Sequence, residues 1–447
     1  MTMLAFGVPP PSVEGGAGRT GGPYNLSEHH DAVVGFHDTV PHGARVPTLS
    51  LRMKNAILRR ARAAREALTL PPLARAELKL DRGGLPGSDP GAERVLPALM
   101  VWMSLAQDRS PSADGGVARS YDLLRGWETS YPETTGYIVP TFIAYGQRTG
   151  REDMLARARR MTDWLVRIQL PGGGFQGGRI DSVPVVPVTF NTGQILIGLA
   201  AAETAFGGYR EPMRRAADWL ARTQDADGCW RSHPTPFAAP GEKEYETHVA
   251  WGLFEAARVE PDRGYGEAGL RNVAWALSSQ AEDGWLPKCC LVDPARPLTH
   301  TIGYALRGVL EAHRYRPDAA LLEAARRIAD GLLLASRPDG HLAGRLSRGW
   351  RPAVPWVCLT GAAQVAICWF MLFRITGERR YLEAGLRANA YVRRTVRLDG
   401  PEEVRGGVKG AFPVDGDYGR FQLLNWAAKF LADSLMLEAD LKREGLA

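Results

Sequence analysis

Cysteine is scarce in this chain, and so are the motifs of several common protein classes. Five cysteines in 447 residues are too few to staple a small secreted scaffold, so the fold must depend on a hydrophobic core. The N-terminus has no cationic segment followed by a long apolar one, so we expect no secretory signal and a cytoplasmic location. The sequence also lacks a P-loop and any closely spaced set of metal ligands. We therefore expect neither a cofactor nor a metal.

The chain has no general excess of charge of the kind that nucleic-acid binding requires. Its net charge of +6 comes from one segment, Arg45 to Lys79, in which nine basic residues stand against two acidic ones. We interpret this segment as a solvated helix face rather than a phosphate-binding or membrane-binding patch. The predicted partner is a small molecule or an oligosaccharide, with no nucleic acid.

Long apolar runs are also few. The 22 residues between Arg351 and Arg374 contain no charged residue and have the length of a membrane span. Pro352 and Pro355 break the start of the run, and polar residues interrupt the rest. We therefore predict a helix buried on all sides and no membrane span.

What the sequence does contain is an internal repeat. Four segments each show an amphipathic helix that ends in Gln or Ser, then a glycine-containing turn and usually an aromatic residue. The Gln or Ser recurs about every 55 residues, a period typical of repeated helical units. A glycine follows where a helix end favours a left-handed residue. The repeated positions are Gln169, Gln224, Gln280 and Ser336, with Gly174, Gly228, Gly284 and Gly340.

A second set of helices alternates with the first and carries few charges. Polar-faced helices that alternate with apolar ones indicate an outer ring around an inner ring. Residues 378–396 supply the fifth outer helix, and residues 93–107 would pair with the last inner helix and close the ring. The sequence thus predicts an all-α fold, an (α/α)6 toroid over residues 91–447. The preceding extension, residues 1–90, would contain 50 irregular residues and then a basic helix over 51–68. The inner helices are predicted at 136–149, 192–206, 247–259, 301–313, 359–376 and 421–441.

The repeat of helix, Gln, Asp-Gly and aromatic resembles the QW-like repeats of terpenoid cyclases and prenyltransferases. The alternating rings resemble equally those of six-hairpin glycosidases, polysaccharide lyases and sugar epimerases. The resemblance covers about four-fifths of the chain and implies the toroid. Since toroids host unrelated reactions, function must be argued from the site.

Acidic side chains occur where loops lead into the inner helices, at the predicted mouth of the ring. Glu133 and Glu246 stand at two of these positions, and Asp415 and Asp417 at a third. A glycosidase needs two carboxylates that flank the scissile bond, one of them protonated. Alternatively, these acids stabilise helix N-termini through the helix dipole.

Two histidines occupy matching positions in neighbouring hairpins. His248 and His300 each stand beside threonines, although Thr192, Thr247, Thr301 and Thr360 could simply be N-caps. A lyase or C5-epimerase abstracts a proton beside a carboxylate, and it needs a His, Tyr or Lys base together with amide or cationic groups that neutralise the acid. The base candidates are His248, His300 and Tyr304, and the stabilising candidates are Asn191, Gln194, Arg405 and Lys409.

Aromatic residues accompany these polar groups. Sugar rings stack on aromatic faces, but an isoprenoid chain would use the same walls, and core packing is the alternative. The predicted binding residues of this kind are Trp127, Tyr137, Tyr245, Trp285 and Trp356, with Asp417 as a further polar contact.

These patterns favour a carbohydrate-active enzyme whose substrate is an acidic, uronate-containing glycan or glycoside. The reaction would be hydrolysis or proton abstraction, and the catalytic candidates are Glu133, Glu246, His248, His300 and Tyr304. An isoprenoid cyclase is the first alternative, although the Asp-x-Asp-Asp motif of such enzymes is only approximated at residues 413–419. A toroidal binding protein without catalysis is the second.

Overall fold

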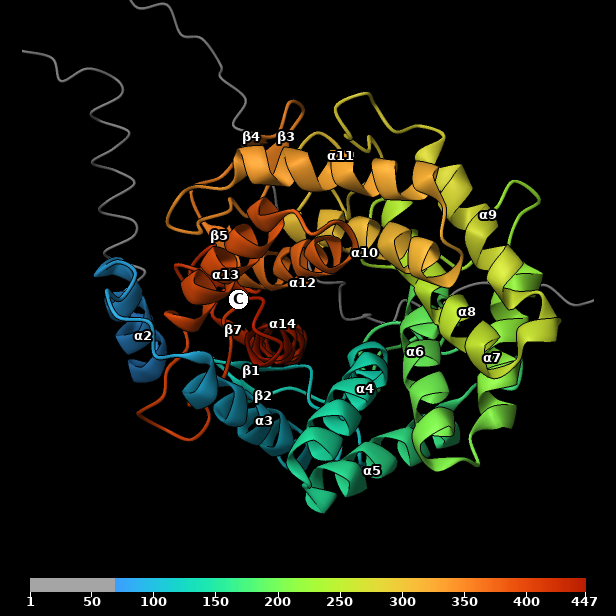
Figure 1. Ribbon diagram of the computed structural model, residues 1–447. Helices are drawn as coiled ribbons and strands as arrows, with labels where there is room; N and C mark the ends of the chain where they lie inside the picture. Colours follow the sequence, from blue (N-terminus) through green and yellow to red (C-terminus); the bar gives the residue numbers. More distant parts are fainter. Residues whose placement is uncertain (1–68) are drawn as a thin grey trace, which may run out of the picture. The chain divides into compact units, whose positions relative to one another are not determined.

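The computed structural model describes residues 69–447, and within them the chain forms two concentric rings of helices (Figure 1). The predicted irregular segment and the basic helix over 51–68 lie outside the described residues. The outer ring comprises α3 (Ala92–Asp108), α5 (Glu152–Ile168), α7 (Arg210–Thr223), α9 (Tyr265–Leu277), α11 (Ala319–Ala335) and α13 (Arg379–Arg393). The inner ring comprises α4 (Pro132–Thr149), α6 (Thr189–Phe206), α8 (Thr247–Val259), α10 (Thr299–Tyr315), α12 (Leu359–Thr376) and α14 (Asn425–Arg443). The predicted (α/α)6 toroid is confirmed, including closure of the ring by α3 against α14.

The two rings differ in burial as the sequence pattern predicts. Outer helices bury one stripe, whereas inner helices are covered by neighbours on both sides and by the outer ring. α12 shows this most clearly, since fourteen of its residues are buried. Among the described residues, α12 alone has the length and apolar composition to cross a membrane, and 78% of that stretch is buried inside the protein.

The repeated Gln residues connect one outer helix to the next. The Nε2 group of Gln224 donates to the carbonyl of Gly228 in its own turn and to that of Ala268 on α9. Gln169 makes the equivalent pair of bonds to Gly173 and to Pro212. One side chain therefore stabilises both the turn and the contact between hairpins, which explains why Gln recurs at this position.

The repeated glycines have the predicted left-handed backbone in three of the four turns. Gly228, Gly284 and Gly340 have φ values of +95°, +83° and +87°. In the first turn the left-handed residue is Gly173 (φ +99°) and not Gly174, so that assignment was wrong by one position. These turns press against the next outer helix, because a Cβ on Gly284 would lie 2.4 Å from the carbonyl carbon of Arg327.

We expect Gly284→Ala to destabilise the fold by about 1–3 kcal/mol from backbone strain alone, with the clash against Arg327 adding to that loss. Gly264→Ala is the matched control, since Gly264 also has a left-handed backbone (φ +74°) but nothing lies within 4 Å of its added Cβ. Urea denaturation should show the larger loss for Gly284→Ala. Equal losses would mean that the turn does not press on the neighbouring helix.

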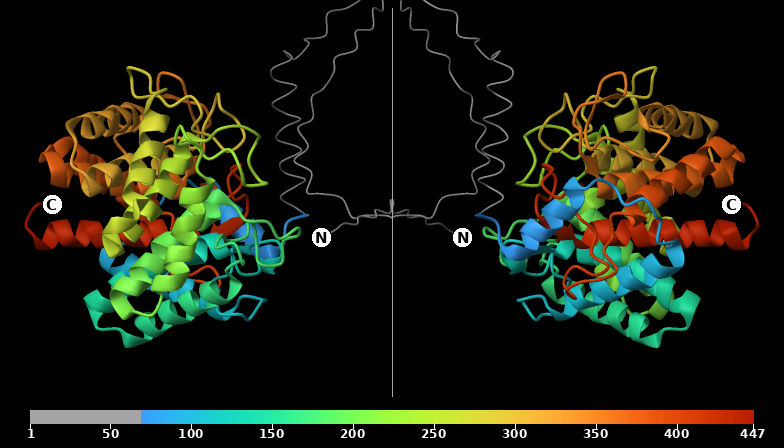
Figure 2. Two further views of the ribbon diagram at one scale, coloured as in Figure 1. Left: turned by 90° about the vertical axis from the view of Figure 1, so that its right-hand side faces the viewer. Right: turned by 90° about the vertical axis from the view of Figure 1, so that its left-hand side faces the viewer.

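Short strands join the loops that lead into the inner helices. All their pairings are antiparallel, so the described residues contain no parallel sheet. Figure 2 shows these loops gathered on the side of the ring opposite the C-terminus, and we call this side the mouth. The strands form the sheets β2-β1-β7, β3-β4 and β5-β6, with bounds β1 Ser120–Asp122, β2 Gly126–Trp127, β3 Leu346–Ser347, β4 Arg351–Pro352, β5 Val357–Cys358, β6 Ala411–Phe412 and β7 Gln422–Leu424.

One further helix, α2 (Pro72–Arg82), precedes the rings and packs against the C-terminal loops. Glu77 binds Arg397 with a 2.7 Å contact and Lys409 with a 3.0 Å contact. The described residues from Thr69 onward belong to one compact unit with the rings. The predicted division near residue 90 remains a prediction, but α2 on its N-terminal side makes buried contacts with the toroid.

Candidate active site

Side chains from the first turns of the inner helices meet near the centre of the ring. Tyr304 on α10 lies between the two predicted histidines, with ring centroids 4.3 Å from His248 and 4.4 Å from His300. Phe190 on α6 contacts Tyr304 at 5.1 Å, and Phe430 on α14 contacts it at 6.0 Å. Four inner helices thus bring the two histidines and the tyrosine into one cluster.

Each histidine is held by the amide of a glutamine on a neighbouring inner helix. The Nδ1 atom of His248 lies 2.6 Å from Gln194 Oε1, and that of His300 lies 2.8 Å from Gln364 Oε1. An amide oxygen can only accept, so Nδ1 carries the hydrogen in both rings. Nε2 is left as the proton acceptor, and Nε2 of His248 is buried without a partner.

Burial keeps both imidazoles neutral. His248 is fully buried and His300 is 5% exposed. Loss of hydration lowers the pKa of His300 to about 4, against a smaller opposing effect of Gln364. The same loss lowers the pKa of His248 well below its ordinary value, and the nearby cations Arg307 and Lys429 lower it further. Both rings are therefore proton acceptors at neutral pH.

Glu133, in the first turn of α4, lies at the edge of this cluster and is partly exposed. Burial of its carboxyl raises its pKa to about 7, although Tyr131 and Arg119 oppose the change. Burial raises the pKa of Tyr304 and of Tyr245, and the Glu133 carboxylate adds to both changes. Glu133 can therefore hold a proton near neutral pH beside the tyrosine that separates the histidines.

Glu246 ends the 3-10 segment η1 (Glu244–Glu246) directly before α8. It is 5% exposed, its Oε2 atom has no hydrogen-bond partner, and burial raises its pKa to about 8. Its electrostatic neighbours are Lys243, Tyr245 and Cys229. Glu246 thus stands two residues before His248 in the chain, but the electrostatic neighbours of His248 among the described residues do not include it. Tyr245 interacts electrostatically with both Glu246 and Glu133.

The raised pKa of Glu246 predicts a loss of stability as pH increases. The folded protein keeps this proton up to about pH 8, whereas the unfolded chain releases it near pH 4.5, so the free energy of unfolding falls between these values. At about 1.4 kcal/mol per pKa unit the full effect is a few kcal/mol. We expect thermal denaturation between pH 7 and 9, where the histidines are largely neutral, to show a falling Tm that flattens in Glu246→Gln. The exposed Glu282→Gln is the control and should keep the wild-type slope.

Unpaired polar atoms gather in the same place. Five buried side-chain nitrogen or oxygen atoms of the predicted site residues have no hydrogen-bond partner. Buried polar groups are nearly always paired, so these atoms are open to hydrogen bonds with a ligand. These five atoms are Asn191 Nδ2, Gln194 Nε2, Tyr245 Oη, Glu246 Oε2 and His248 Nε2. The hydroxyl of Tyr137 shares a hydrogen bond with that of Tyr304.

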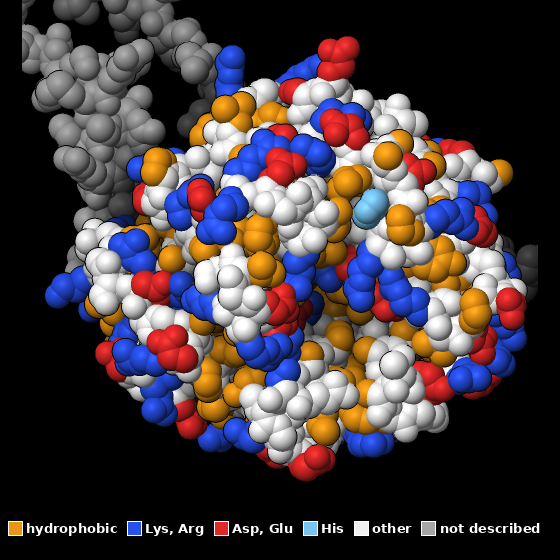
Figure 3. Space-filling model, viewed as in Figure 1, with side chains coloured by type: hydrophobic (Ala, Val, Ile, Leu, Met, Phe, Trp, Pro, Cys, Tyr) orange, Lys and Arg blue, Asp and Glu red, His pale blue; other side chains and the backbone are white. Residues whose placement is uncertain are grey.

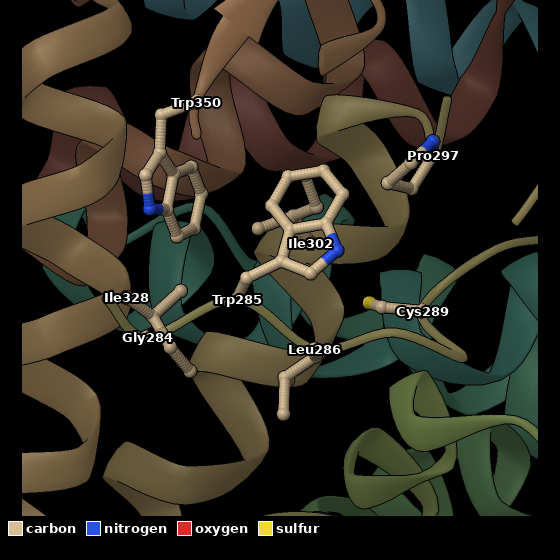
Figure 4. A pocket seen from close by; sticks show the side chains of 8 residues that line it. All are labelled: Gly284, Trp285, Leu286, Cys289, Pro297, Ile302, Ile328 and Trp350. Atoms are coloured by element: carbon tan, nitrogen blue, oxygen red, sulfur yellow. The ribbon is translucent and has the colours of Figure 1, made fainter. Parts of the chain in front are cut away.

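Several other predicted residues have structural partners away from these groups. Trp127 packs on Trp102 and Tyr121. Trp285 meets Trp350 edge-on beside an apolar cavity of about 10 Å³ (Figure 4). Trp356 packs with Leu298, Cys358 and Ala411 in a small separate core.

The predicted substrate-binding residues Arg405, Lys409 and Asp417 do not join the cluster around the two histidines. Lys409 is 3% exposed, and its ammonium group binds Asp81 and Glu77 of α2. Arg405 and Asp417 are exposed. No group of three or more His, Cys, Asp or Glu side chains within residues 69–447 is arranged to hold a metal ion.

The predicted threonine N-caps were wrong, since no cap hydrogen bond is made at α6, α8, α10 or α12. Three of the threonines instead hold neighbouring segments together. Thr192 accepts from the amide of Phe175, Thr247 donates to the carbonyl of Ala305, and Thr301 donates to that of Cys289.

Sequence reasoning missed several residues of the cluster. Arg119 lies over the rings of Tyr131 and Trp426, at 5.9 and 5.2 Å, and lowers the pKa of Glu133. Tyr418 accepts from Trp426 Nε1 at 2.9 Å and contacts His300. Tyr131 and Tyr418 lie in the loops that lead into the inner helices, and this position was the one property in the sequence that could have pointed to them. Many other residues of these loops share it.

Comparison with solved structures supports the architecture. An unsaturated glucuronyl hydrolase specific for heparin is similar over 80% of this chain and 100% of its own, with a TM-score of 0.65 and 16% identity. A D-mannose isomerase gives 0.62 and 11%, covering 78% and 99% of the two chains. The cellobiose 2-epimerase of Bacillus thermoamylovorans B4167 gives 0.60 and 12%, covering 78% and 97%. No protein-family model matches the chain, and no curated protein matches it either. At these identities the likeness shows the toroid fold alone.

Proposed function

We propose that this chain is a carbohydrate-active enzyme that transfers a proton at a sugar carbon, in the manner of an epimerase, isomerase or lyase. The observation that carries the proposal is the pair of neutral imidazoles on either side of Tyr304, each held with Nδ1 protonated. A reaction of this type needs a base to remove the proton. Nε2 of one imidazole takes the proton from carbon, and in an epimerisation or isomerisation the imidazolium so formed returns it. The sugar-enzyme names of the similar structures support the substrate class.

The unpaired amide groups suit the negative charge that such a reaction creates. Proton removal beside a carbonyl or carboxylate places charge on oxygen, and oriented donors stabilise it. Gln194 binds His248 through Oε1 and has Nε2 free, while Asn191 lies one turn earlier on α6 with Nδ2 free. Glu133 would supply a proton to the oxygen, because its carboxyl is half protonated near pH 7.

Hydrolysis is the second candidate, favoured by Glu133 as a protonated general acid. A glycosidase also needs an ionised partner carboxylate. Glu246 fits that role poorly at neutral pH, because its pKa of about 8 keeps it protonated. Proton transfer at carbon is therefore the reaction that this arrangement supports better.

The predicted uronate preference is part of the proposal. Of the cations expected to bind a substrate carboxylate, Lys409 is already bound to Asp81 and Glu77. Arg119 lies near Glu133 and already binds Glu128 at 2.7 Å, so it would take this role by exchanging Glu128 for the substrate carboxylate. An acidic sugar would approach Arg119 at the mouth, and a neutral sugar would not need it.

The test is incubation in deuterium oxide with aldoses, disaccharides and uronate-containing oligosaccharides. NMR should show solvent deuterium at a single sugar carbon, and ultraviolet absorbance would reveal elimination. New reducing ends without deuterium would establish hydrolysis instead. Binding without either change would support the toroidal binding protein, and no interaction with any sugar would favour an isoprenoid ligand.

A further inference from the structure

A buried lysine lies beneath the aromatic rings of the site. Lys429 on α14 is 1% exposed, and its Nζ atom binds Asp433 at 2.7 Å, one turn further along the helix. The ammonium lies 4.3 Å from the ring centre of Phe430 and 5.1 Å from that of Tyr137. A fully buried lysine is rare unless it is paired, and here its pair lies away from the cluster along α14.

A buried arginine repeats this arrangement on α10. Arg307 binds Glu311 at 2.8 Å, again one turn further along, and Glu311 is fully buried. The guanidinium lies 4.1 Å from the ring centre of Trp251, and Lys429 lies 5.9 Å from the same ring. In both ion pairs, therefore, the cation lies against the aromatic rings and its carboxylate lies one helical turn further along the same helix.

Two aromatic side chains, Trp251 and Phe430, contact His248 and at least one of these cations. Trp251 contacts His248 edge-on at 5.1 Å, and Phe430 contacts it at 6.5 Å. Viewed from the side where the inner helices end, the surface is hollowed near the middle of the ring, with Lys and Arg as well as Asp and Glu side chains around the hollow (Figure 3). One layer of aromatic rings thus separates two positive charges from the imidazole, where little water screens them.

We infer that Lys429 and Arg307 are positioning residues that hold His248 as an unprotonated base, each oriented by its carboxylate one turn away. This role deepens the proposed function, on which its importance for turnover rests. The other titratable groups facing His248 are Tyr304 and His300 on α10. Glu246 in η1 is uncharged at neutral pH, and α6 presents the neutral amide of Gln194. On α8 itself, Glu255 accepts from Nε1 of Trp251 at 2.7 Å. Burial lowers the pKa of Lys429, although Asp433 opposes the change. Arg307 and Lys429 are the two cationic side chains whose charge lowers the pKa of His248.

The test is an NMR titration of the full-length protein labelled at histidine, with His248 assigned from the variant His248→Gln. In the wild type the ring should stay neutral down to pH 5. In Lys429→Met its pKa should rise, so that the ring begins to titrate above pH 5. Lys429→Arg should restore the wild-type titration. His300 is the internal control, because burial and Gln364 set its pKa and no cation contributes, so its titration should not move.

A wild-type His248 that titrates near 6.5 would overturn the inference. So would a Lys429→Met ring that stays neutral to pH 5, since burial alone would then suffice. If Lys429→Met does not fold, Arg307→Met decides in the same way, because Arg307 is 15% exposed and tolerates replacement better. Turnover is measured separately in His248→Gln. Full activity there would defeat the proposed function and leave the electrostatic result standing.

Discussion

Replacing His300 by alanine should reduce turnover about 10²–10⁴-fold, the loss expected when an acid–base group is removed. The imidazole is positioned by a single bond to Gln364 and lies against Tyr304, so its ring supplies chemistry more than packing. The rate is to be measured as solvent deuterium incorporation into a sugar that binds. Thermal denaturation should show only a small decrease in Tm.

The matched control is His313→Ala, at the other end of the same helix α10, where the ring binds the carbonyl of Asp318. This variant should keep its activity. If His300→Ala unfolds, or turns over sugar at the wild-type rate, His300 is a structural residue and the proton-transfer proposal fails at its central point.

Glu133→Gln should lower the rate by a similar factor and change its pH dependence. In the wild type the protonated carboxyl donates, so activity should fall as pH rises through about 7, the pKa of Glu133. Glutamine cannot release a proton, and the residual activity of the variant should lack this alkaline decrease. A pH–rate profile from pH 5.5 to 9 measures both effects.

The control variant Glu152→Gln distinguishes proton donation by Glu133 from simple stabilisation of a helix N-terminus. Glu152 lies in the first turn of α5 as Glu133 lies in that of α4, but it is exposed. A dipole contribution predicts a loss of about 0.3–1 kcal/mol in both variants and no change in rate. Full activity in Glu133→Gln with that small loss would show that the carboxyl serves the helix alone.

The sequence by itself determined the ring architecture. Helix period, the Gln–glycine turns and the alternation of polar and apolar helices are local properties, and each hairpin repeats them. They were sufficient to place all twelve ring helices and to predict that residues 359–376 form a buried helix. They also singled out His248 and His300, because the repeat makes equivalent positions visible in neighbouring hairpins.

Only the tertiary structure decided which polar residues could act together. The glutamines that hold the two histidines lie 54 and 64 residues away from them, and the cations near His248 come from α10 and α14. Lys409 carried the right charge in the sequence, yet its partner Asp81 is 328 residues away and occupies it. Protonation depends on burial and on neighbours across the ring, since a group's pKa follows its solvation and nearby charges rather than its local sequence.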